Sequence, residues 1–213
     1  TITVENKKDG GYKIYINKQP VELNGLDGPY LIDSTYYFVN EKNEIKSQKF
    51  NDKDSLLVQV DNPEKDFFYV HINDSTKISN SVFEMPEKLI AISDIEGNFE
   101  AFSSFLKANK VIDEKFNWIF GNGHLVLNGD FVDRGQNVTQ VLWLIYKIEN
   151  EAKKSGGEVH YVLGNHELLN FQGSYKYNNQ KYDEVSKLIY KKQDQSYLSL
   201  TTQSDYVKYI YSN

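Results

Sequence analysis

Cysteine is absent from the 213 residues, which excludes disulfide bonds and thiolate metal ligands. Histidine is scarce, with four residues, and Arg134 is the single arginine among 24 basic residues. No apolar run reaches the roughly 20 residues that a membrane-spanning helix requires. The net charge of −6, without a lysine cluster, argues against nucleic-acid binding. Any metal site must therefore be built from oxygen and imidazole ligands.

Proline is confined to the first part of the chain, where Pro86 is the last of four. This part alternates short β-type runs with turn signals, which predicts a small antiparallel β domain over residues 1–86. We expect a hairpin over residues 36–46. A structural or carbohydrate-binding role for residues 1–85 would rest on this pattern alone. The predicted strands are 12–16, 21–23, 36–39, 56–60 and 67–72, separated by turns at 9–11, 24–25, 27–29 and 61–63.

From residue 88 the pattern changes to strand, helix and strand. Apolar runs at 89–92, 124–127 and 159–163 predict buried strands, and two amphipathic segments between them predict helices. This order predicts two βαβ units with a parallel sheet, and hence an α/β fold after the antiparallel domain. Asn137 and Gln140 form a predicted capping box for the second helix, which should stop at 156–157. The predicted helix faces are Ala101, Phe102, Phe105 and Leu106, and then Val138, Val141, Leu142, Ile145 and Ile148.

A polar cluster follows each of these three strands. The clusters are Asp94-Ile95-Glu96, residues 129–135 and residues 164–167, and their leading polar residues are 36 and 35 positions apart. Each interval matches one βαβ repeat, so the clusters should meet at the carboxyl edge of the sheet, where open α/β folds bind ligands. A surface ion pair between Asp133 and Arg134 would not explain this spacing.

These clusters resemble the motifs of the calcineurin-like metallophosphoesterases, particularly the branch that contains the phosphoprotein Ser/Thr phosphatases. The resemblance covers residues 89–167, and residues 129–135 and 164–167 are its most specific parts. It implies a centre of two divalent metal ions. Asp130 would bridge the two ions, Asp94 would bind one of them and Asn165 the other.

The same resemblance implies the hydrolysis of phosphate monoesters by a metal-activated hydroxide. His166 would protonate the leaving alcohol, and Asp133 would orient His166. Arg134 would hold the phosphate, with Asn165 as a second substrate contact. A lone guanidinium in a chain that otherwise uses lysine suits bidentate phosphate recognition.

Two departures from the family pattern affect the metal centre. The family usually has Asp-x-His in the first motif, and this chain has Glu96 in place of the histidine. Glu96 could ligate a metal, favouring Mn²⁺ or Mg²⁺ over Zn²⁺, or it could point away; we expect Mn²⁺, with Fe, Zn²⁺ and Mg²⁺ as alternatives. The family also takes histidine ligands from later strands, and no histidine follows His166.

Residues 168–213 are rich in tyrosine and predict helices. One face would hold Tyr182, Val185, Leu188 and Ile189, and another turn would cover residues 206–211. The segment would line a wall of the site or form a surface helix pair. We expect residues 87–213 to be the N-terminal half of a metallophosphoesterase domain, with little activity alone.

The alternative hypothesis is a non-catalytic module that retains the fold and a phosphate or metal pocket. For an active protein the expected partner is a phosphorylated protein or small molecule. The chain begins with Thr1 and has no cysteine, which favours an exported bacterial enzyme over a cytoplasmic one.

Overall fold

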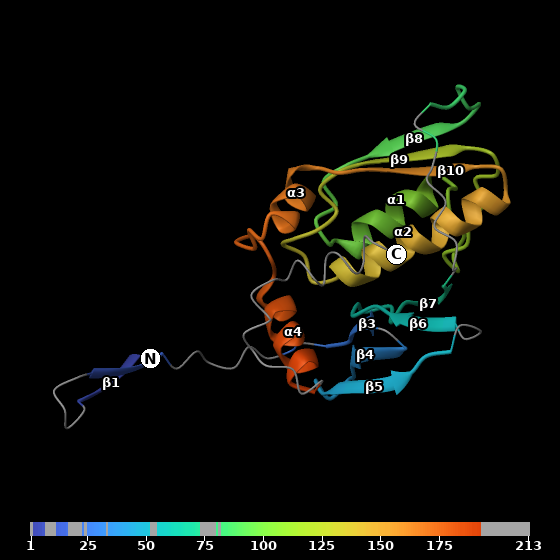
Figure 1. Cartoon of the computed structure of the whole chain (residues 1–213). Helices are drawn as coiled ribbons and strands as arrows, with labels where there is room; N and C mark the ends of the chain where they lie inside the picture. Colours follow the sequence, from blue (N-terminus) through green and yellow to red (C-terminus); the bar gives the residue numbers. More distant parts are fainter. Residues whose placement is uncertain are drawn as a thin grey trace.

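Three layers make up the body of the molecule in the computed structural model (Figure 1). It describes residues 2–6, 12–16, 23, 25–32, 34–51, 55–72, 80 and 82–192. A parallel sheet forms the first layer, helices α1 (Phe99–Ala108) and α2 (Val138–Lys154) the second, and the antiparallel strands within residues 27–71 the third. The helix α2 contacts strands of both sheet layers, so the helices are the shared centre of the fold.

The parallel sheet has the order β10-β9-β8 and comprises β8 (Leu89–Ile92), β9 (His124–Asn128) and β10 (Glu158–Val162). Both crossover helices, α1 (Phe99–Ala108) and α2 (Val138–Lys154), cover the same face of this sheet (Figure 1). The Asn98 side chain caps α1 by accepting the Ala101 N–H at 3.0 Å. The two predicted βαβ units with parallel strands are confirmed.

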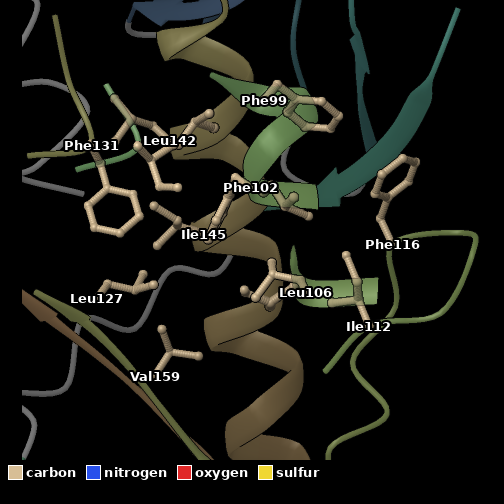
Figure 2. Packing of buried hydrophobic residues seen from close by; sticks show 14 of the residues in the cluster. Phe99, Phe102, Leu106, Ile112, Phe116, Leu127, Phe131, Leu142, Ile145 and Val159 are labelled. Carbon is tan, nitrogen blue, oxygen red and sulfur yellow. The ribbon is translucent and has the colours of Figure 1, made fainter. Parts of the chain in front are cut away.

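Between this sheet and the helices lies an apolar core, shown in Figure 2. Strand residues such as Leu127 and Val159 point into it, and α1 contributes Phe102 and Leu106. Full burial of such a side chain contributes about 1.5–3 kcal/mol, so this core fixes how the strands and helices are aligned. The predicted face of α2 is buried throughout, whereas Ala101 of the first predicted face is exposed.

In the described part of the chain, the antiparallel strands form three separate sheets. A hairpin joins β1 (Ile2–Asn6) to β2 (Tyr12–Ile16), and a second joins β6 (Ser55–Gln59) to β7 (Phe67–His71). The third sheet contains β3 (Asp27–Ile32), β4 (Thr35–Val39) and β5 (Ile45–Lys49) in that order. The predicted hairpin over 36–46 is the β4–β5 pair. Of the strand predicted at 21–23, residues 21 and 22 lie outside the described residues.

Strand β3 corrects the prediction of a turn at residues 27–29. Glycine and proline usually mark turns, but here they begin a strand at the edge of its sheet. Pro29 has no N–H to donate, and an edge strand with an irregular register tolerates that loss. The pairing with β4 shifts between Asp27 and Tyr30, which accommodates the two residues between them.

Two of the antiparallel sheets, β6–β7 and β3–β5, pack against different partners. Val58 and Phe68 of the β6–β7 hairpin belong to the same apolar cluster as α1 and α2. The β3–β5 sheet instead packs against helix α4 (Gln180–Lys192), through Val185 and Ile189. The N-terminal strands therefore contact three helices that follow residue 86. The domain boundary at residue 86 stays a prediction.

Helix α4 follows the short helix α3 (Asn165–Phe171) and corrects part of the predicted helical face. Tyr182, Val185 and Ile189 are buried, but Leu188 is 39% exposed. The helix packs on the β3–β5 sheet, so it is not a free surface helix. The second predicted helical segment, at 206–211, lies outside the described residues. No described helix has the length and hydropathy needed to cross a membrane.

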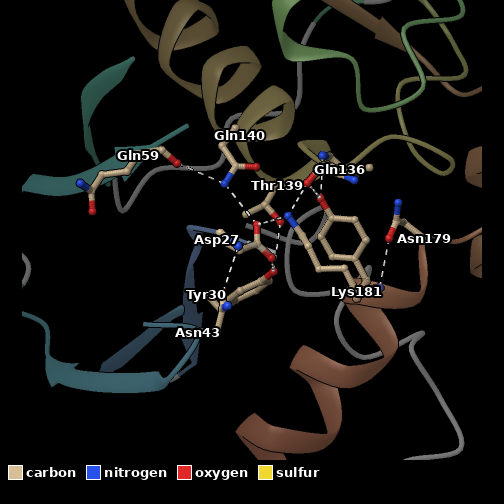
Figure 3. Close-up of polar contacts among 12 residues, drawn as sticks. Asp27, Tyr30, Asn43, Gln59, Gln136, Thr139, Gln140, Asn179 and Lys181 are labelled. Carbon is tan, nitrogen blue, oxygen red and sulfur yellow. Dashed lines mark hydrogen bonds and ion pairs between the residues drawn. The ribbon is translucent and has the colours of Figure 1, made fainter. Parts of the chain in front are cut away.

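A buried polar network joins β3, α2 and α4 (Figure 3). The Asp27 carboxylate accepts from Gln140 Nε2 at 3.1 Å and lies 3.3 Å from Lys181 Nζ. Tyr30 donates its hydroxyl to the same carboxylate. The predicted capping box at Asn137 is therefore wrong: the Gln140 side chain points to Asp27, and the Asn137 side chain caps no N–H.

Candidate active site

The three parallel strands end side by side, and each is followed by one of the polar clusters found in the sequence. Asp94 follows β8, Asp130 follows β9, and Asn165 begins α3 after β10. The Glu96 N–H donates to the Asp130 carbonyl at 2.9 Å, and Asp130 Oδ1 accepts the His166 N–H at 2.8 Å. The structure therefore brings the three clusters together at one edge of the sheet.

Backbone strain is concentrated in these clusters. A non-glycine residue at positive φ costs about 1 kcal/mol or more, and such residues gather at functional sites. Gly164 adds a close approach, because a Cβ there would lie 2.4 Å from Asp130 Oδ1. The residues at positive φ in the first two clusters are Asp94 (57°), Glu96 (48°), Asp130 (60°), Asp133 (72°) and Arg134 (54°).

Asp133 and His166 form a buried pair. His166 Nδ1 lies 2.7 Å from Asp133 Oδ2, and both side chains are almost fully enclosed. The other carboxylate oxygen, Oδ1, accepts from Asn170 Nδ2 at 2.8 Å, and the same amide donates to the His166 carbonyl at 2.9 Å. The carboxylate thus keeps the proton on Nδ1 and leaves Nε2 as the nitrogen for a substrate.

Glu167 is a completely buried carboxylate beneath the site. It accepts from the backbone N–H groups of Asp130, Phe131 and Gly164, each at 2.8 Å, and from the Tyr161 hydroxyl at 2.9 Å. Four donors compensate the cost of burying this charge. One side chain therefore ties the second cluster to the third.

Arg134 is held between Glu96 and the turn before α4. Its guanidinium pairs with the Glu96 carboxylate, and its side chain remains half exposed. The Arg134 N–H donates to the Tyr177 carbonyl at 3.0 Å, and the Arg134 carbonyl accepts from Asn179 Nδ2 at 3.1 Å. The guanidinium carbon lies 5.5 Å from the centre of the Tyr177 ring. The arginine predicted to bind phosphate thus faces solvent with its backbone fixed.

A cavity of about 500 Å³ opens beside Arg134. The turn after β6, residues 60–63, forms one wall, and residues 94–100 and 134–137 form the others. The β6–β7 hairpin of the N-terminal part therefore contributes to the surroundings of the predicted catalytic residues. No catalytic constellation in this hairpin was apparent in the sequence.

Comparison with known proteins supports the same reading of these clusters. The family model of the calcineurin-like phosphoesterases matches residues 87–211, which is more than half of the chain. The chain belongs to the calcineurin-like phosphoesterase family.

Two curated relatives of this phosphoesterase are phosphatases by name. Shewanella-like protein phosphatase 2 of Arabidopsis thaliana is 34% identical over 105 residues, which are 49% of this chain and 27% of the relative. Shewanella-like protein phosphatase 1 of Plasmodium berghei is 41% identical over 98 residues, which are 46% and 27% of the two chains. The chain therefore spans about a quarter of the length of these relatives in the aligned part.

Solved structures extend the similarity beyond the motifs. The crystal structure of the cold-active protein-tyrosine phosphatase of a psychrophilic Shewanella species superposes with a TM-score of 0.58 at 32% identity, covering 87% of this chain and 55% of that one. A structure of a cold-active protein tyrosine phosphatase at 1.1 Å gives a TM-score of 0.57 at 34% identity, with 85% and 54% covered. Because at least 85% of the chain is covered, the similarity extends into the N-terminal part.

The donor set of this phosphoesterase fits part of a metal centre. Asp94 and Asn165 are exposed at the ends of the two outer strands, and Asp130 lies at the end of the central strand between them, so hard oxygen donors meet at one edge. Among the described residues, however, no three histidine or acidic side chains are grouped to hold an ion. Glu96 pairs with Arg134 and does not complete such a group.

Three residues around the phosphoesterase site had no role in the sequence analysis. Glu167 was part of a recognised motif, and its position as the third residue of a helix after glycine is a signal for a backbone contact. Asn170 lies one helical turn after His166, so the two side chains share a face of α3. Tyr177 gave no signal, because its ring reaches the site from a turn.

Proposed function

We propose that this chain carries the phosphate-binding and proton-donating face of a metal-dependent phosphomonoesterase. The observation that supports this most is the buried contact of 2.7 Å between His166 and Asp133. Arg134 follows Asp133 directly, and Asp94, Asp130 and Asn165 follow the three parallel strands. Family membership and the names of the relatives agree with a phosphorylated substrate, either a protein or a small molecule.

Asp94, Asp130 and Asn165 would hold divalent ions, for which Mn²⁺ is the expected choice. When bound, such ions polarise the phosphoryl group and lower the pKa of a coordinated water. Completing two coordination spheres requires ligands beyond the three named. Arg134 would bind two phosphoryl oxygens with its planar guanidinium, and phosphate would then compete with Glu96 for it.

His166 would act as the general acid. Its Nε2 proton moves to the leaving oxygen as the bond from phosphorus to that oxygen breaks, while water adds to phosphorus, giving an alcohol and inorganic phosphate. Asp133 orients the imidazole ring, and Asn170 fixes the Asp133 carboxylate from its other side. In this proposal His166 donates the proton, while Arg134 and the metal ligands bind the phosphate.

Leaving-group dependence tests this assignment in the full-length protein with Mn²⁺. We expect His166→Asn to lower kcat for an alkyl phosphate by about 10²- to 10⁴-fold, because an alkoxide needs the proton. The loss for p-nitrophenyl phosphate should be much smaller, since that leaving group departs without a proton. His71→Asn changes an exposed histidine on β7 and is the matched control. Equal losses for both substrates would contradict the role.

A second candidate is a non-catalytic module that binds phosphate or a metal. It is favoured by the pairing of Glu96 with Arg134 and by the incomplete donor set in the described residues. Mn²⁺ affinity measured by calorimetry separates the two readings of Glu96. If Glu96 serves Arg134, Glu96→Gln leaves Mn²⁺ affinity unchanged while Asp130→Asn reduces it; if Glu96 is a ligand, both reduce it.

A further inference from the structure

The loop that carries Arg134, residues 134–137, is enclosed between two other segments. On one side, the Gly135 N–H donates to the Glu96 carbonyl at 2.9 Å, and the Asn137 N–H donates to the Gly97 carbonyl at 3.2 Å. On the other side lie the turn before helix α4 and the first residues of that helix. Arg134 has a φ of 54°, a backbone region that an L side chain disfavours. Such a conformation persists only while the surrounding contacts hold it.

The hydroxyl of Tyr182 joins this loop to the start of helix α2. It donates to the Gln136 carbonyl at 2.8 Å and accepts the Val138 N–H at 2.7 Å. The Tyr182 side chain is buried, and Lys181 Nζ donates to the same Gln136 carbonyl (Figure 3). Val138 is the first residue of α2, so its N–H has no partner within the helix. One hydroxyl therefore fixes two backbone groups at the end of the arginine loop.

Asn179 uses the two polar groups of its side chain for different partners. Its Oδ1 accepts the Lys181 N–H at 3.1 Å and so caps helix α4, while its Nδ2 donates to the Arg134 carbonyl at 3.1 Å. The Arg134 N–H donates to the Tyr177 carbonyl at 3.0 Å. Both backbone polar groups of the arginine are thus bonded to the segment that leads into α4.

We propose that Tyr182 and Asn179 are positioning residues that hold the arginine loop in the conformation that binds phosphate. Each fixes a backbone group in the loop, whereas the Arg134 side chain is half exposed and has to be directed toward the phosphate. A loop that is ordered before binding loses less entropy when phosphate binds, so its phosphate affinity is higher. The contact between His166 and Asp133 does not involve these bonds, so proton transfer should change little. This inference rests on the proposed function and adds residues that set the phosphate affinity of the same site.

Two substitutions break these bonds with little other change. Tyr182→Phe removes only the hydroxyl, and Asn179→Ser keeps an oxygen that can cap α4 but removes the amide donor. In the full-length protein with Mn²⁺, we expect the inhibition constant of inorganic phosphate and the KM of a phosphomonoester to rise about three- to tenfold in Tyr182→Phe and about two- to fivefold in Asn179→Ser. The kcat should change less than about twofold, because the bonds contribute to binding and not to the chemical step. Tyr36→Phe, which removes a hydroxyl bonded to Gln48 on the neighbouring strand, is the control and should leave both constants unchanged.

A double substitution tests whether the effect of Tyr182 passes through Arg134. In an Arg134→Ala background, Tyr182→Phe should change the inhibition constant of phosphate less than about twofold, because the side chain that the loop positions is missing. A full effect in that background would overturn the proposal, since Tyr182 would then support the fold as a whole. A fall in kcat as large as the rise in KM would overturn it for the same reason.

Calorimetric titration of the full-length protein with inorganic phosphate gives a readout without turnover. If the wild type hydrolyses no phosphoester, the proposed function fails, but phosphate binding that Arg134→Ala abolishes and Tyr182→Phe weakens still supports the positioning role. Phosphate affinity that Tyr182→Phe leaves unchanged overturns that role. Absence of phosphate binding by the wild type would overturn both.

Discussion

Two fully buried carboxylates, Glu167 and Asp27, hold two different regions of this phosphoesterase. Glu167 accepts three backbone N–H groups from the strand-end loops of the site and one hydroxyl from β10, so all its partners are neutral. Asp27 is bound by side chains, including the ammonium of Lys181 and the amide of Gln140, from α4 and α2. Glu167 ties consecutive motifs, whereas Asp27 ties elements far apart in the chain.

The two carboxylates differ in what they hold in place. A carboxylate that collects backbone donors fixes the path of the main chain and cannot be replaced by another pairing. A carboxylate in a side-chain network can lose a partner and let the others rearrange. Lys181 also donates to the Gln136 carbonyl, so the Asp27 network reaches the loop that follows Arg134. The N-terminal strands are thereby connected to the site indirectly, through Lys181 and Gln136.

Replacement of Glu167 should have the largest effect. Glu167→Gln puts an NH₂ group against backbone N–H donors, and we expect a loss of about 3 kcal/mol in the free energy of unfolding, measured in urea. Activity should fall as well, since Asp130 and Phe131 lose their anchor. Glu149→Gln on the exposed side of α2, where Glu149 pairs with Lys153, is the control and should cost under about 0.5 kcal/mol. A loss no larger than that of the control would contradict the assignment.

Disruption of the Asp27 network should have a smaller effect, in a different place. Lys181→Met leaves Asp27 with Gln140 and Tyr30, and we expect a loss of about 2 kcal/mol in the free energy of unfolding. Amide hydrogen exchange should rise in β3 and the N-terminal end of α2 but not at Glu167. The double variant Asp27→Asn/Lys181→Met should cost less than the two single changes together, because no charge is left unpaired. Additive losses would show that the two residues act independently.

Replacement of a histidine in the pair His124 and His160 should have the smallest effect. The pair lies on the face of the parallel sheet that is opposite to the helices. His160 Nε2 lies 3.0 Å from His124 Nδ1, and Phe83 packs on both rings. Partial burial lowers the pKa of His160, and neighbouring His124 lowers it further, while Glu158 opposes the shift.

Because the folded-state pKa of His160 is below its ordinary value of 6.5, stability from this group is complete above that pH and is lost on acidification below it. We expect the decrease in unfolding free energy between pH 7 and pH 5 to be smaller in His160→Gln than in the wild type. Identical dependence of the unfolding free energy on pH in the variant and the wild type would contradict a lowered pKa of His160 in the folded state.

Much of the site's location was predictable from the sequence, because strand ends and their following polar residues obey a fixed repeat. The βαβ order placed Asp94, Asp130 and Asn165 at one edge, and the structure has them there. The contacts between side chains were not predictable to the same degree. Glu167 depends on N–H groups that become available only when the loop after β9 turns at positive φ, and no local pattern encodes that.

The errors in the fold have a related cause. Residues 27–29 have the composition of a turn, and only pairing with β4 converts them into a strand. Gln140 stands at the right spacing for a capping box, but its side-chain amide donates to the buried Asp27 carboxylate, so the side chain points away from the start of α2. In each case a contact made outside the segment itself overrides a local preference.

The most direct test of the central claim is the effect of Asp130→Asn on phosphomonoester hydrolysis by the full-length protein with Mn²⁺. Asp130 lies between the two other donors and orients the His166 backbone, so the account predicts a loss of at least about 10³-fold in kcat, with unfolding free energy changed by less than about 1 kcal/mol. Turnover that remains near the wild-type rate in this variant would contradict the assignment of these strand ends as the catalytic site.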